Sequence, residues 1–510
     1  MMNRLKTALK IIAIVVVVVC IVFGAIYLEL TIPSERELWR IKDNNLEDPI
    51  VVNNLLLFKG HKGEFLHSWC EYIYAVDKNT GKTVWSSEGY TTDQYCSHSS
   101  GPVYTAIILL AKEDTILISS TYWTIGNDEQ EFVLYALDHA TGELIWEMAG
   151  YAGYPYSRSA LLDYTIYDTD YVYVASREGL FSAIDPSNGK QIWKQSISTV
   201  DYTDNIHIEY YDQVVSYYES GKNSITAFDA RDGRQIWEIS SLDFVEQILY
   251  SEQLMYLITS SYQFDGNKYP TVGHPPFDIT VLNTKTGAEI WTLSFWEKFS
   301  PRVEIVGDKV YVLTYDSEGM FDDFKVLRRL VVVKKETGDQ IWEFNKDYSH
   351  GDLIYLVQND VIYISTYDNY LFALDNNTGI SIWQAQSPCF PYDFYIEGNT
   401  FVAICEEKYV FAFDTVSGVQ KWVVDVGMEK YWYPREFILV DNGVVYVSGP
   451  TSGKVYALDI ETGDELWTWN HWHPRDKAYM IKALDNDILY VDQYRRFLEQ
   501  DWFFALKAQP

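Results

Sequence analysis

A short pattern recurs nine times along this 510-residue chain, and it constrains the fold more than any other feature. It reads aromatic residue, alanine, aliphatic residue, aspartate, three residues, glycine, three residues, tryptophan. One clear copy runs from Tyr135 to Asp138, with Gly142 and Trp146. The aspartate position is held by Asp77, Asp138, Asp185, Asp229, Asp375, Asp414 and Asp459, and by Asn283 and Lys334 in two degenerate copies. Nine copies with one internal spacing indicate a repeat architecture, in which each unit stacks on its neighbours.

Each copy has the physical character of a β-hairpin. The aspartate accepts backbone hydrogen bonds at a turn, and the glycine takes the positive φ that closes it. Two further alternating runs precede each hairpin, for example 436–440 and 443–448 before Lys454–Leu458. Four antiparallel strands every 39 to 61 residues are typical of a propeller blade. We expect each repeat tryptophan to dock against the neighbouring blade, near an alanine.

The two ends of the chain complete the pattern. Residues 503–507 read as a third strand without its return, and residues 35–39 read as a return strand without its hairpin. Pairing them would leave no exposed sheet edge and would close the ring with a blade shared by both termini. The sequence therefore predicts nine complete units and one split unit, ten in all.

The tandem pattern, as in Tyr456-Ala457-Leu458-Asp459 with Gly463 and Trp467, resembles the pyrroloquinoline-quinone-like (PQQ-like) repeat superfamily. That superfamily includes quinoprotein alcohol dehydrogenases and the propeller lipoprotein of the outer-membrane assembly machinery. The resemblance covers about residues 36–507 and implies an all-β, closed propeller of four-stranded blades. Eight blades are the norm of the superfamily, so the resemblance and the count of ten leave blade number open.

The N-terminal residues predict a membrane anchor. Arg4, Lys6 and Lys10 precede an uncharged run, residues 11–28, whose 18 residues would span about 27 Å as a helix. Acidic residues follow the run, which places the N-terminus in the cytoplasm and the rest outside. We expect a cytoplasmic tail over 1–10, a transmembrane anchor over 11–28, a linker over 29–35 and the propeller over 36–510. A cleaved signal peptide and a lipoprotein anchor at Cys20 remain alternatives.

Charge narrows the classes of partner. Forty basic and 72 acidic residues give a net charge of −32, which repels nucleic-acid phosphates and anionic lipid headgroups. We therefore expect no nucleic-acid partner. The charge suits cations, basic protein surfaces or simple solubility.

The remaining cysteines form two sequence-local pairs, Cys70 with Cys96 and Cys389 with Cys405. Outside the cytoplasm these are candidates for two disulfides, and buried free thiols are the alternative. Neither pair has the CxxC spacing of zinc or haem attachment.

Long insertions gather in the connections between blades and between second and third strands. Examples are 86–102, 122–131, 262–276 and 316–324. These connections define an insertion-bearing face, where binding residues would lie over a rigid scaffold. Seven tryptophans outside the repeat lie in or just before such connections: Trp69, Trp123, Trp296, Trp432, Trp469, Trp472 and Trp502. We interpret Trp69, Trp123, Trp432 and Trp472 as a candidate aromatic binding surface, and packing of these rings against the blades is the alternative.

Metal and cofactor signals are weak. His471 and His473 flank Trp472, but no further zinc or copper ligand is identifiable, so they join the candidate binding surface and not a metal site. The acidic stretch 316–323 lacks the regular spacing of an EF-hand. Quinoprotein dehydrogenases hold their cofactor beneath a disulfide between adjacent cysteines, and no two cysteines are adjacent here.

These observations favour a non-enzymatic binding or assembly scaffold, closer to the assembly lipoprotein than to the dehydrogenases. We expect it at the cell membrane, single-pass, with the propeller on the extracellular or periplasmic side and a protein or small-ligand partner on the insertion-bearing face. We expect no cofactor and no catalytic residue. The alternative is a quinone-dependent dehydrogenase, with pyrroloquinoline quinone and calcium as its cofactors.

Overall fold

The structure is a computed structural model, and it describes most of the chain from Arg36 onward. The described residues are 36–43, 49–62, 70–87, 104–111, 114–123, 129–153, 171–176, 179–197, 206–219, 224–240, 244–260, 277–296, 299–318, 325–348, 353–405, 409–426, 438–449, 454–470, 477–495 and 501–509. They form β-strands and contain no α-helix. Within these ranges no helix is long and apolar enough to cross a membrane, and the predicted anchor over 11–28 lies outside them.

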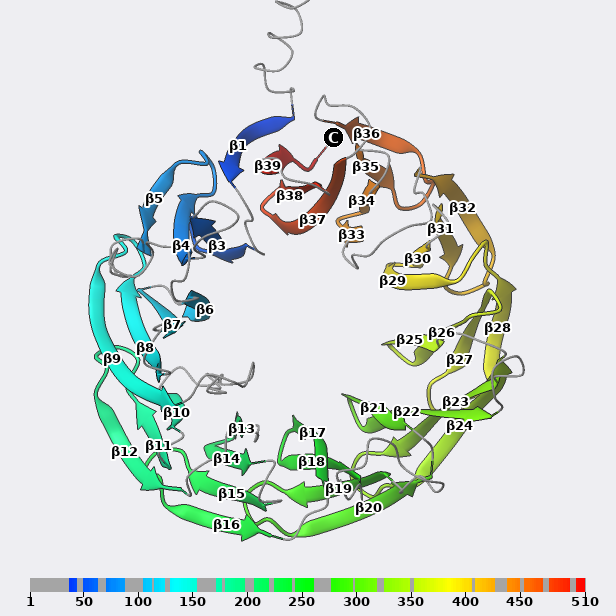
Figure 1. Ribbon diagram of the computed structural model, residues 1–510. Coiled ribbons are helices and arrows are strands. Elements are labelled where there is room, and N and C mark those ends of the chain that lie inside the picture. The colour runs from blue at the N-terminus through cyan, green and yellow to red at the C-terminus, as the bar shows by residue number, and fades with distance from the viewer. Residues whose placement is uncertain are drawn as a thin grey trace, which may run out of the picture. The chain divides into compact units, whose positions relative to one another are not determined.

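The strands form ten separate sheets, numbered here as blades 1 to 10 (Figure 1). Blade 1 consists of β2 (Ile50–Val52), β3 (Leu55–Lys62), β4 (Cys70–Asp77) and β5 (Thr83–Ser86). Blade 2 consists of β6 (Tyr104–Ala111), β7 (Thr115–Trp123), β8 (Glu129–Asp138) and β9 (Leu144–Gly153). Blade 3 consists of β10 (Val172–Ser176), β11 (Leu180–Ile184) and β12 (Gln191–Ser196). Blade 4 consists of β13 (Ile206–Tyr211), β14 (Val214–Glu219), β15 (Ser224–Asp229) and β16 (Gln235–Ile239). Blade 5 consists of β17 (Phe244–Ser251), β18 (Leu254–Ser260), β19 (Phe277–Asn283) and β20 (Glu289–Phe295).

Blade 6 consists of β21 (Phe299–Val306), β22 (Lys309–Glu318), β23 (Lys325–Lys334) and β24 (Gln340–Tyr348). Blade 7 consists of β25 (Leu353–Gln358), β26 (Val361–Thr366), β27 (Tyr370–Asp375) and β28 (Ser381–Gln386). Blade 8 consists of β29 (Pro391–Glu397), β30 (Thr400–Cys405), β31 (Tyr409–Asp414) and β32 (Gln420–Asp425). Blade 9 consists of β33 (Ile438–Asp441), β34 (Val444–Gly449), β35 (Lys454–Asp459) and β36 (Glu465–Trp469). Blade 10 consists of β37 (Lys477–Asp485), β38 (Ile488–Arg495), β39 (Asp501–Lys507) and β1 (Glu37–Asp43).

The fold is thus an all-β propeller of ten blades, as the repeat count predicts, and not of the eight that are the norm of the superfamily. Nine blades show four strands, and blade 3 shows three within the described residues. The chain divides into two compact units. One comprises residues 1–60, 76–83 and 391–510, and the other comprises 61–75 and 84–390.

Blade 10 joins the two ends of the chain. β1 lies beside β39 and pairs antiparallel with it (Figure 1). In the register of this pair Trp39 is opposite Ala505. The predicted return strand over 35–39 is therefore present, although it begins at Glu37 and continues to Asp43. Arg36 fixes its start, because its guanidinium donates to the carbonyl of Gln509 at 2.8 Å and lies 4.6 Å from the Trp467 ring.

The aspartate of the repeat caps the turn between the third and fourth strands. In blade 2 one Asp138 carboxylate oxygen accepts hydrogen bonds from the N–H groups of Ala140 and Thr141, at 3.1 and 2.8 Å, and from the Thr141 hydroxyl. The hydrogen bond from that hydroxyl is the main reason why the pKa of Asp138 lies below its ordinary value. The Gly142 N–H donates to the Asp138 carbonyl at 2.8 Å, which closes the turn.

At eight of the repeat turns the glycine lies directly against the tryptophan of the preceding blade. Gly233 has φ of +71°, and a Cβ there would lie 2.6 Å from the Trp193 indole. The same approach, at 2.6–2.8 Å, recurs for Gly81 with Trp39, Gly142 with Trp85, Gly189 with Trp146, Gly287 with Trp237, Gly338 with Trp291, Gly379 with Trp342 and Gly463 with Trp422. Glycine is thus required twice, for its backbone conformation and for the absence of a side chain.

The indole also forms a hydrogen bond across the same junction. Trp237 donates its Nε1–H to the carbonyl of Thr284 at 2.7 Å, and Trp422 donates to that of Ile460 at 2.9 Å. The predicted docking of the tryptophan on the neighbouring blade is confirmed at these junctions. The repeat alanine lies in the tryptophan's own blade, since Ala227 is directly opposite Trp237 in the register. We call the combined ring contact and hydrogen bond the indole lock.

The small alanine leaves room for a row of rings across the blade. In blade 9, Tyr446, Ala457 and Trp467 are consecutive partners across three strands. The Tyr446 and Trp467 ring centroids are 6.1 Å apart, above the alanine. A larger residue between them would displace one ring from the blade interface.

The two hairpin turns of a blade lie at one edge. The Ile460 N–H, next to the repeat aspartate of blade 9, donates to the carbonyl of Gly443 in the turn between the first two strands, at 3.0 Å. Ala508 donates in the same way to Asp487 of blade 10, at 2.8 Å. We call this edge the turn face. It is opposite the insertion-bearing face, because adjacent strands run in opposite directions.

We predict that Gly233→Ala destabilises the protein more than Gly307→Ala. Gly307 also has positive φ (+61°), but a Cβ added there would meet no atom within 4 Å. Gly307→Ala should cost about 1–2 kcal/mol for the left-handed backbone, and Gly233→Ala should cost about 1–3 kcal/mol more for the clash with Trp193. Chemical denaturation of both variants measures the difference, and equal losses would contradict the indole lock.

We predict that Lys334→Asp stabilises blade 6. Lys334 replaces the capping aspartate, yet the Gly338 N–H still donates to the Lys334 carbonyl at 2.9 Å. The new carboxylate should add about 0.5–1 kcal/mol by accepting hydrogen bonds from the N–H groups of the turn.

That gain should depend on pH with a defined sign. Asp138 and Asp185 have pKa values below the ordinary 3.8, so the stabilisation from these caps is present above that value and is lost as the pH falls through the lowered pKa. Denaturation of Lys334→Asp and wild type at neutral pH and in acid tests this. A gain that persists in acid, or no gain at neutral pH, would contradict the capping role, and Lys334→Asn serves as the pH-independent control.

Candidate functional site

The candidate binding residues of the insertion-bearing face lie largely outside the described part of the chain. Trp69, Trp432, Trp472, His471 and His473 all lie outside it. Trp123 ends β7, where its backbone partner is Gln130, but its side chain is not among the described ones. The predicted aromatic surface therefore stays a prediction.

Three other tryptophans of this set have described side chains, and they differ. Trp469, in β36 of blade 9, is buried with its ring 5.1 Å from Tyr479 and 4.9 Å from Phe504, so it packs against blade 10. Trp502 lies beneath the Arg40 guanidinium at 5.0 Å. Trp296, directly after β20, is 72% exposed. Packing thus accounts for Trp469, while Trp296 remains accessible.

Two of the four candidate disulfide cysteines are fully described. Cys389 and Cys405 are both disulfide-bonded and both buried. Cys96 lies outside the described residues, and Cys70 is described only as the first residue of β4.

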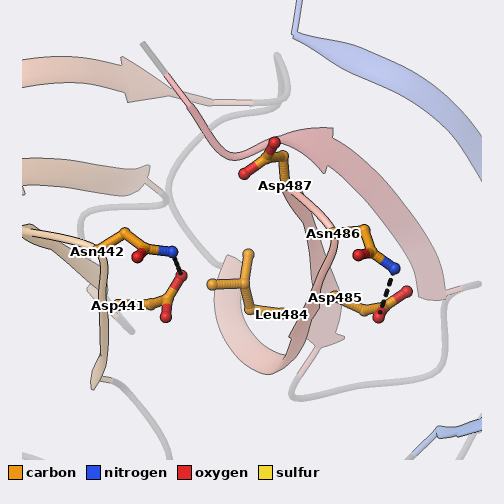
Figure 2. Close-up of a pocket in the computed structure, with 6 residues that line it drawn as sticks. All are labelled: Asp441, Asn442, Leu484, Asp485, Asn486 and Asp487. Atoms are coloured by element: carbon orange, nitrogen blue, oxygen red, sulfur yellow. Dashed lines mark hydrogen bonds between the residues drawn. The ribbon is translucent and has the colours of Figure 1, made fainter.

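An acidic depression of about 390 Å³ lies on the turn face of blades 9 and 10. Figure 2 shows its two sides, which are the turn after β33 and the turn after β37. Its lining residues are Asp441, Asn442, Leu484, Asp485, Asn486 and Asp487. Asn442 and Asn486 have positive φ, as the first residues of tight hairpin turns do. Turn geometry therefore places the carboxylates and amides at this edge.

Hydrogen bonds and one ion pair order the acidic depression. The Asn442 amide donates to Asp441 at 2.7 Å, and the Asn486 amide donates to Asp485 at 3.0 Å (Figure 2). Lys78 contacts Asp485 at 2.6 Å and balances its charge. The other two carboxylates leave the depression negative.

The pKa of the buried Tyr446 hydroxyl is affected by the negative charge at this edge. Burial raises its pKa to about 12, and the nearby Asp441 and Asp487 carboxylates contribute to the rise. Tyr446 therefore stays a neutral phenol at physiological pH and offers no general acid or base near neutrality.

The chemistry of the acidic depression suits binding of amines or other cations. Carboxylate and amide oxygens accept hydrogen bonds, and the lining contains no cysteine, histidine or serine nucleophile. Among the described residues, no group of three or more histidine, cysteine or acidic side chains is arranged to hold a metal ion. This edge was not predicted from the sequence, although Asp-Asn-Gly at 441–443 and Asp-Asn-Asp at 485–487 are recognisable turn signals.

Curated relatives match only short segments of the chain. Quinoprotein alcohol dehydrogenase PedE of Pseudomonas putida is 45% identical over 53 residues, which are 10% of this chain and 8% of the relative. The serine/threonine-protein kinase AfsK of Streptomyces coelicolor is 27% identical over 99 residues, which are 19% of this chain and 12% of the relative. The chain thus spans about a tenth of the length of these relatives.

Solved structures align over more of the chain. BamB from Moraxella catarrhalis aligns with a TM-score of 0.36 and 17% identity, over 68% of this chain and 94% of that one. A europium-containing methanol dehydrogenase aligns with a TM-score of 0.35 and 13% identity, over 76% and 85%.

A family model covers well over half of the chain. It carries the description outer membrane protein assembly factor BamB, and it matches residues 130–256, 275–393 and 328–478. The matched ranges contain the repeat hairpins from Asp138 to Asp459. The chain therefore belongs to this family of PQQ-like repeat β-propellers.

Proposed function

We propose that the chain is a membrane-anchored, extracytoplasmic scaffold that binds or assembles other proteins and catalyses no reaction. The observation that carries the proposal is the family match, because a model described as an assembly factor matches residues 130–256, 275–393 and 328–478. The matches to quinoprotein dehydrogenases cover about a tenth of the chain. A repeat scaffold with varied loops on one face is well suited to such a role.

The alternative function is a quinone-dependent dehydrogenase, favoured by the 45% identity to PedE within one segment. Activity would then depend on pyrroloquinoline quinone and calcium. The sequence lacks the adjacent cysteines that the resemblance would require for the cofactor site.

We predict that the purified protein forms no stoichiometric complex with pyrroloquinoline quinone and calcium. Titration followed by cofactor absorbance should show no saturable change, and dye-linked oxidation of alcohols should stay at background. A known quinoprotein dehydrogenase serves as the positive control. A tight one-to-one complex with alcohol oxidation would replace the scaffold by the dehydrogenase.

We propose an extracytoplasmic location for the propeller. The disulfide-bonded Cys389 and Cys405 support it, because disulfides persist in oxidising compartments. Positive charge before residues 11–28 and negative charge after them support the orientation.

Protease added to intact cells, or to spheroplasts where an outer membrane exists, should digest the propeller. The same digestion after lysis gives the complete-access control. A cytoplasmic protein must survive the first treatment, to show that the membrane is intact. Protection of the propeller until lysis would contradict the location.

We also propose that the ten blades close into a ring through β1. Supporting this, Trp39 donates its Nε1–H to the Lys78 carbonyl of blade 1 at 2.9 Å, and a Cβ at Gly81 would lie 2.6 Å from its indole. Blade 10 thus contacts blade 1 through the same indole lock that joins consecutive blades elsewhere.

Ring closure predicts that Trp39→Ala and Trp237→Ala destabilise the protein equally. Both indoles are buried, and each substitution should cost about 3–5 kcal/mol, as other large core truncations do. Denaturation measures both. A Trp39→Ala variant as stable as wild type, beside a destabilised Trp237→Ala variant, would contradict closure.

A further inference from the structure

The position at which the chain enters blade 10 bears on how the molecule meets its membrane. β1 starts beside the end of β39, since Glu37 is the register partner of Leu506. The end of β39 is at the turn face, where Ala508 donates to Asp487. Arg36 is fixed there by its hydrogen bond to the Gln509 carbonyl and by the Lys507 N–H, which donates to the Arg36 carbonyl at 2.8 Å. The N-terminal segment therefore leaves the fold at the turn face.

The short linker limits which edge of blade 10 can lie at the membrane. Seven residues, 29–35, separate the apolar segment from Arg36, and fully extended they span about 24 Å. β1 itself has seven residues and a length of about 23 Å. Bringing the insertion-bearing edge of blade 10 to the membrane would require the linker to run fully stretched along the whole blade. The turn face needs no such stretching.

The turn face of blade 8 departs from the repeat in a way that suits a membrane. Val416 and Val419, at the tip of the turn between its third and fourth strands, are 69% and 63% exposed. The residue after the turn glycine is polar, charged or alanine in other blades, namely Lys82, Glu143, Lys190, Arg234, Ala288, Asp339 and Asp464, and Ile380 of blade 7 is the other aliphatic exception. Exposed aliphatic side chains at a turn tip contribute nothing to the blade core, and two of them on one tip suit contact with an apolar phase.

Blades 8, 9 and 10 present their turns side by side. Lys421, just after the blade 8 turn, contacts Glu461 of the blade 9 turn at 2.6 Å. Trp467 of blade 9 donates to the carbonyl of Ala508 in blade 10 at 2.8 Å. The valine tip and the chain exit thus belong to one edge of the same compact unit.

The negative charge of this edge favours zwitterionic over anionic lipid headgroups. Asp441, Asp485 and Asp487 line the acidic depression on the same face. Anionic headgroups would be repelled, whereas the outermost charge of zwitterionic headgroups is an ammonium group, which carboxylates attract.

We propose that the turn face of blades 8 to 10 rests on the zwitterionic surface of the membrane that holds the N-terminal segment, with Val416 and Val419 at the lipid interface. This proposal rests on the anchored topology proposed above. It directs the insertion-bearing face away from the membrane, where partners can reach it. The tether supplies a high effective concentration, so two valines are enough for persistent contact.

The test uses the full chain reconstituted in vesicles of phosphatidylethanolamine and phosphatidylcholine that contain a headgroup-level quencher lipid. A fluorescent amino acid replaces Val419 in one preparation and Asn470 in another. Asn470 is exposed and follows β36 at the opposite edge of blade 9, about 20 Å from its turn. Quenching should be several-fold stronger at position 419 than at position 470. Equal or stronger quenching at position 470 would overturn the proposal.

Matched variants separate the apolar and the electrostatic parts. Val416→Ser, with the reporter at 419, should weaken membrane contact by up to about fivefold, while Asn470→Ser should leave it unchanged. Replacing phosphatidylcholine by phosphatidylglycerol at low salt should also reduce quenching at 419. Unchanged quenching in Val416→Ser, or stronger quenching on the anionic vesicles, would overturn the corresponding part of the proposal.

A carbonate wash distinguishes failure of the proposal from failure of the anchor. A chain that leaves the vesicles in carbonate shows that the anchored topology is wrong, and the membrane-facing turn face is overturned with it. A chain that remains bound, with no quenching at position 419, overturns the turn-face proposal alone.

Discussion

The stacking of a tryptophan on a glycine of the next blade is the interaction on which the rest of this fold depends. A blade is a small twisted sheet with two exposed faces, and it is stable only when both are covered. The indole lock covers them at a fixed position, because the ring fits only where the neighbouring turn has no side chain. Its hydrogen bond, such as that from Trp237 to Thr284, fixes the orientation of the ring as well as its position.

This lock also explains why the two edges of the blades are under different constraints. At the turn face the aspartate, the glycine and the indole of the preceding blade must all keep their places. A longer turn at Gly142, for instance, would displace Trp85 from its seat. The opposite edge has no such requirement, so insertions such as 262–276 are accepted there. The insertion-bearing face can therefore vary in the length of its connections without disturbing the indole lock.

The sequence was sufficient for the fold because the lock is local and repeated. The spacing from Asp138 to Gly142 to Trp146 encodes the turn, the return strand and the junction together, and ten units could be counted from it. Even the split blade was readable, since residues 503–507 lacked a return strand. The partner of the tryptophan was less readable: the alanine suggested itself by size, but Ala227 lies across from Trp237 in the same blade. The residue that lies opposite the tryptophan is decided by the register within its own blade and not by composition.

The candidate site was harder to predict because it depends on where different turns meet. Asp441 and Asp485 are 44 residues apart and belong to ordinary hairpin turns, so nothing local marks them as neighbours. The tryptophans of the insertion-bearing face illustrate the converse. Trp469 and Trp296 are both outside the repeat, yet one packs against Phe504 and the other is exposed. Sequence position assigned them to one face, and only packing separates a core ring from an accessible one.

The aspartates of the repeat turns contribute to the acidic character of the turn face. Seven of the repeat turns use an aspartate carboxylate as a hydrogen-bond acceptor, as Asp375 does for the N–H groups of Asn377 and Thr378. In blade 5 the amide oxygen of Asn283 takes this place. The hydrogen bond from the Thr378 hydroxyl is the main reason why the pKa of Asp375 lies below its ordinary value, and it favours the charged form of that carboxyl group. The turn face is thus acidic for a structural reason before any ligand is considered. The exposed aliphatic pair Val416 and Val419 is a feature of that face which turn formation does not explain, since most other blades have a polar, charged or alanine residue after the turn glycine.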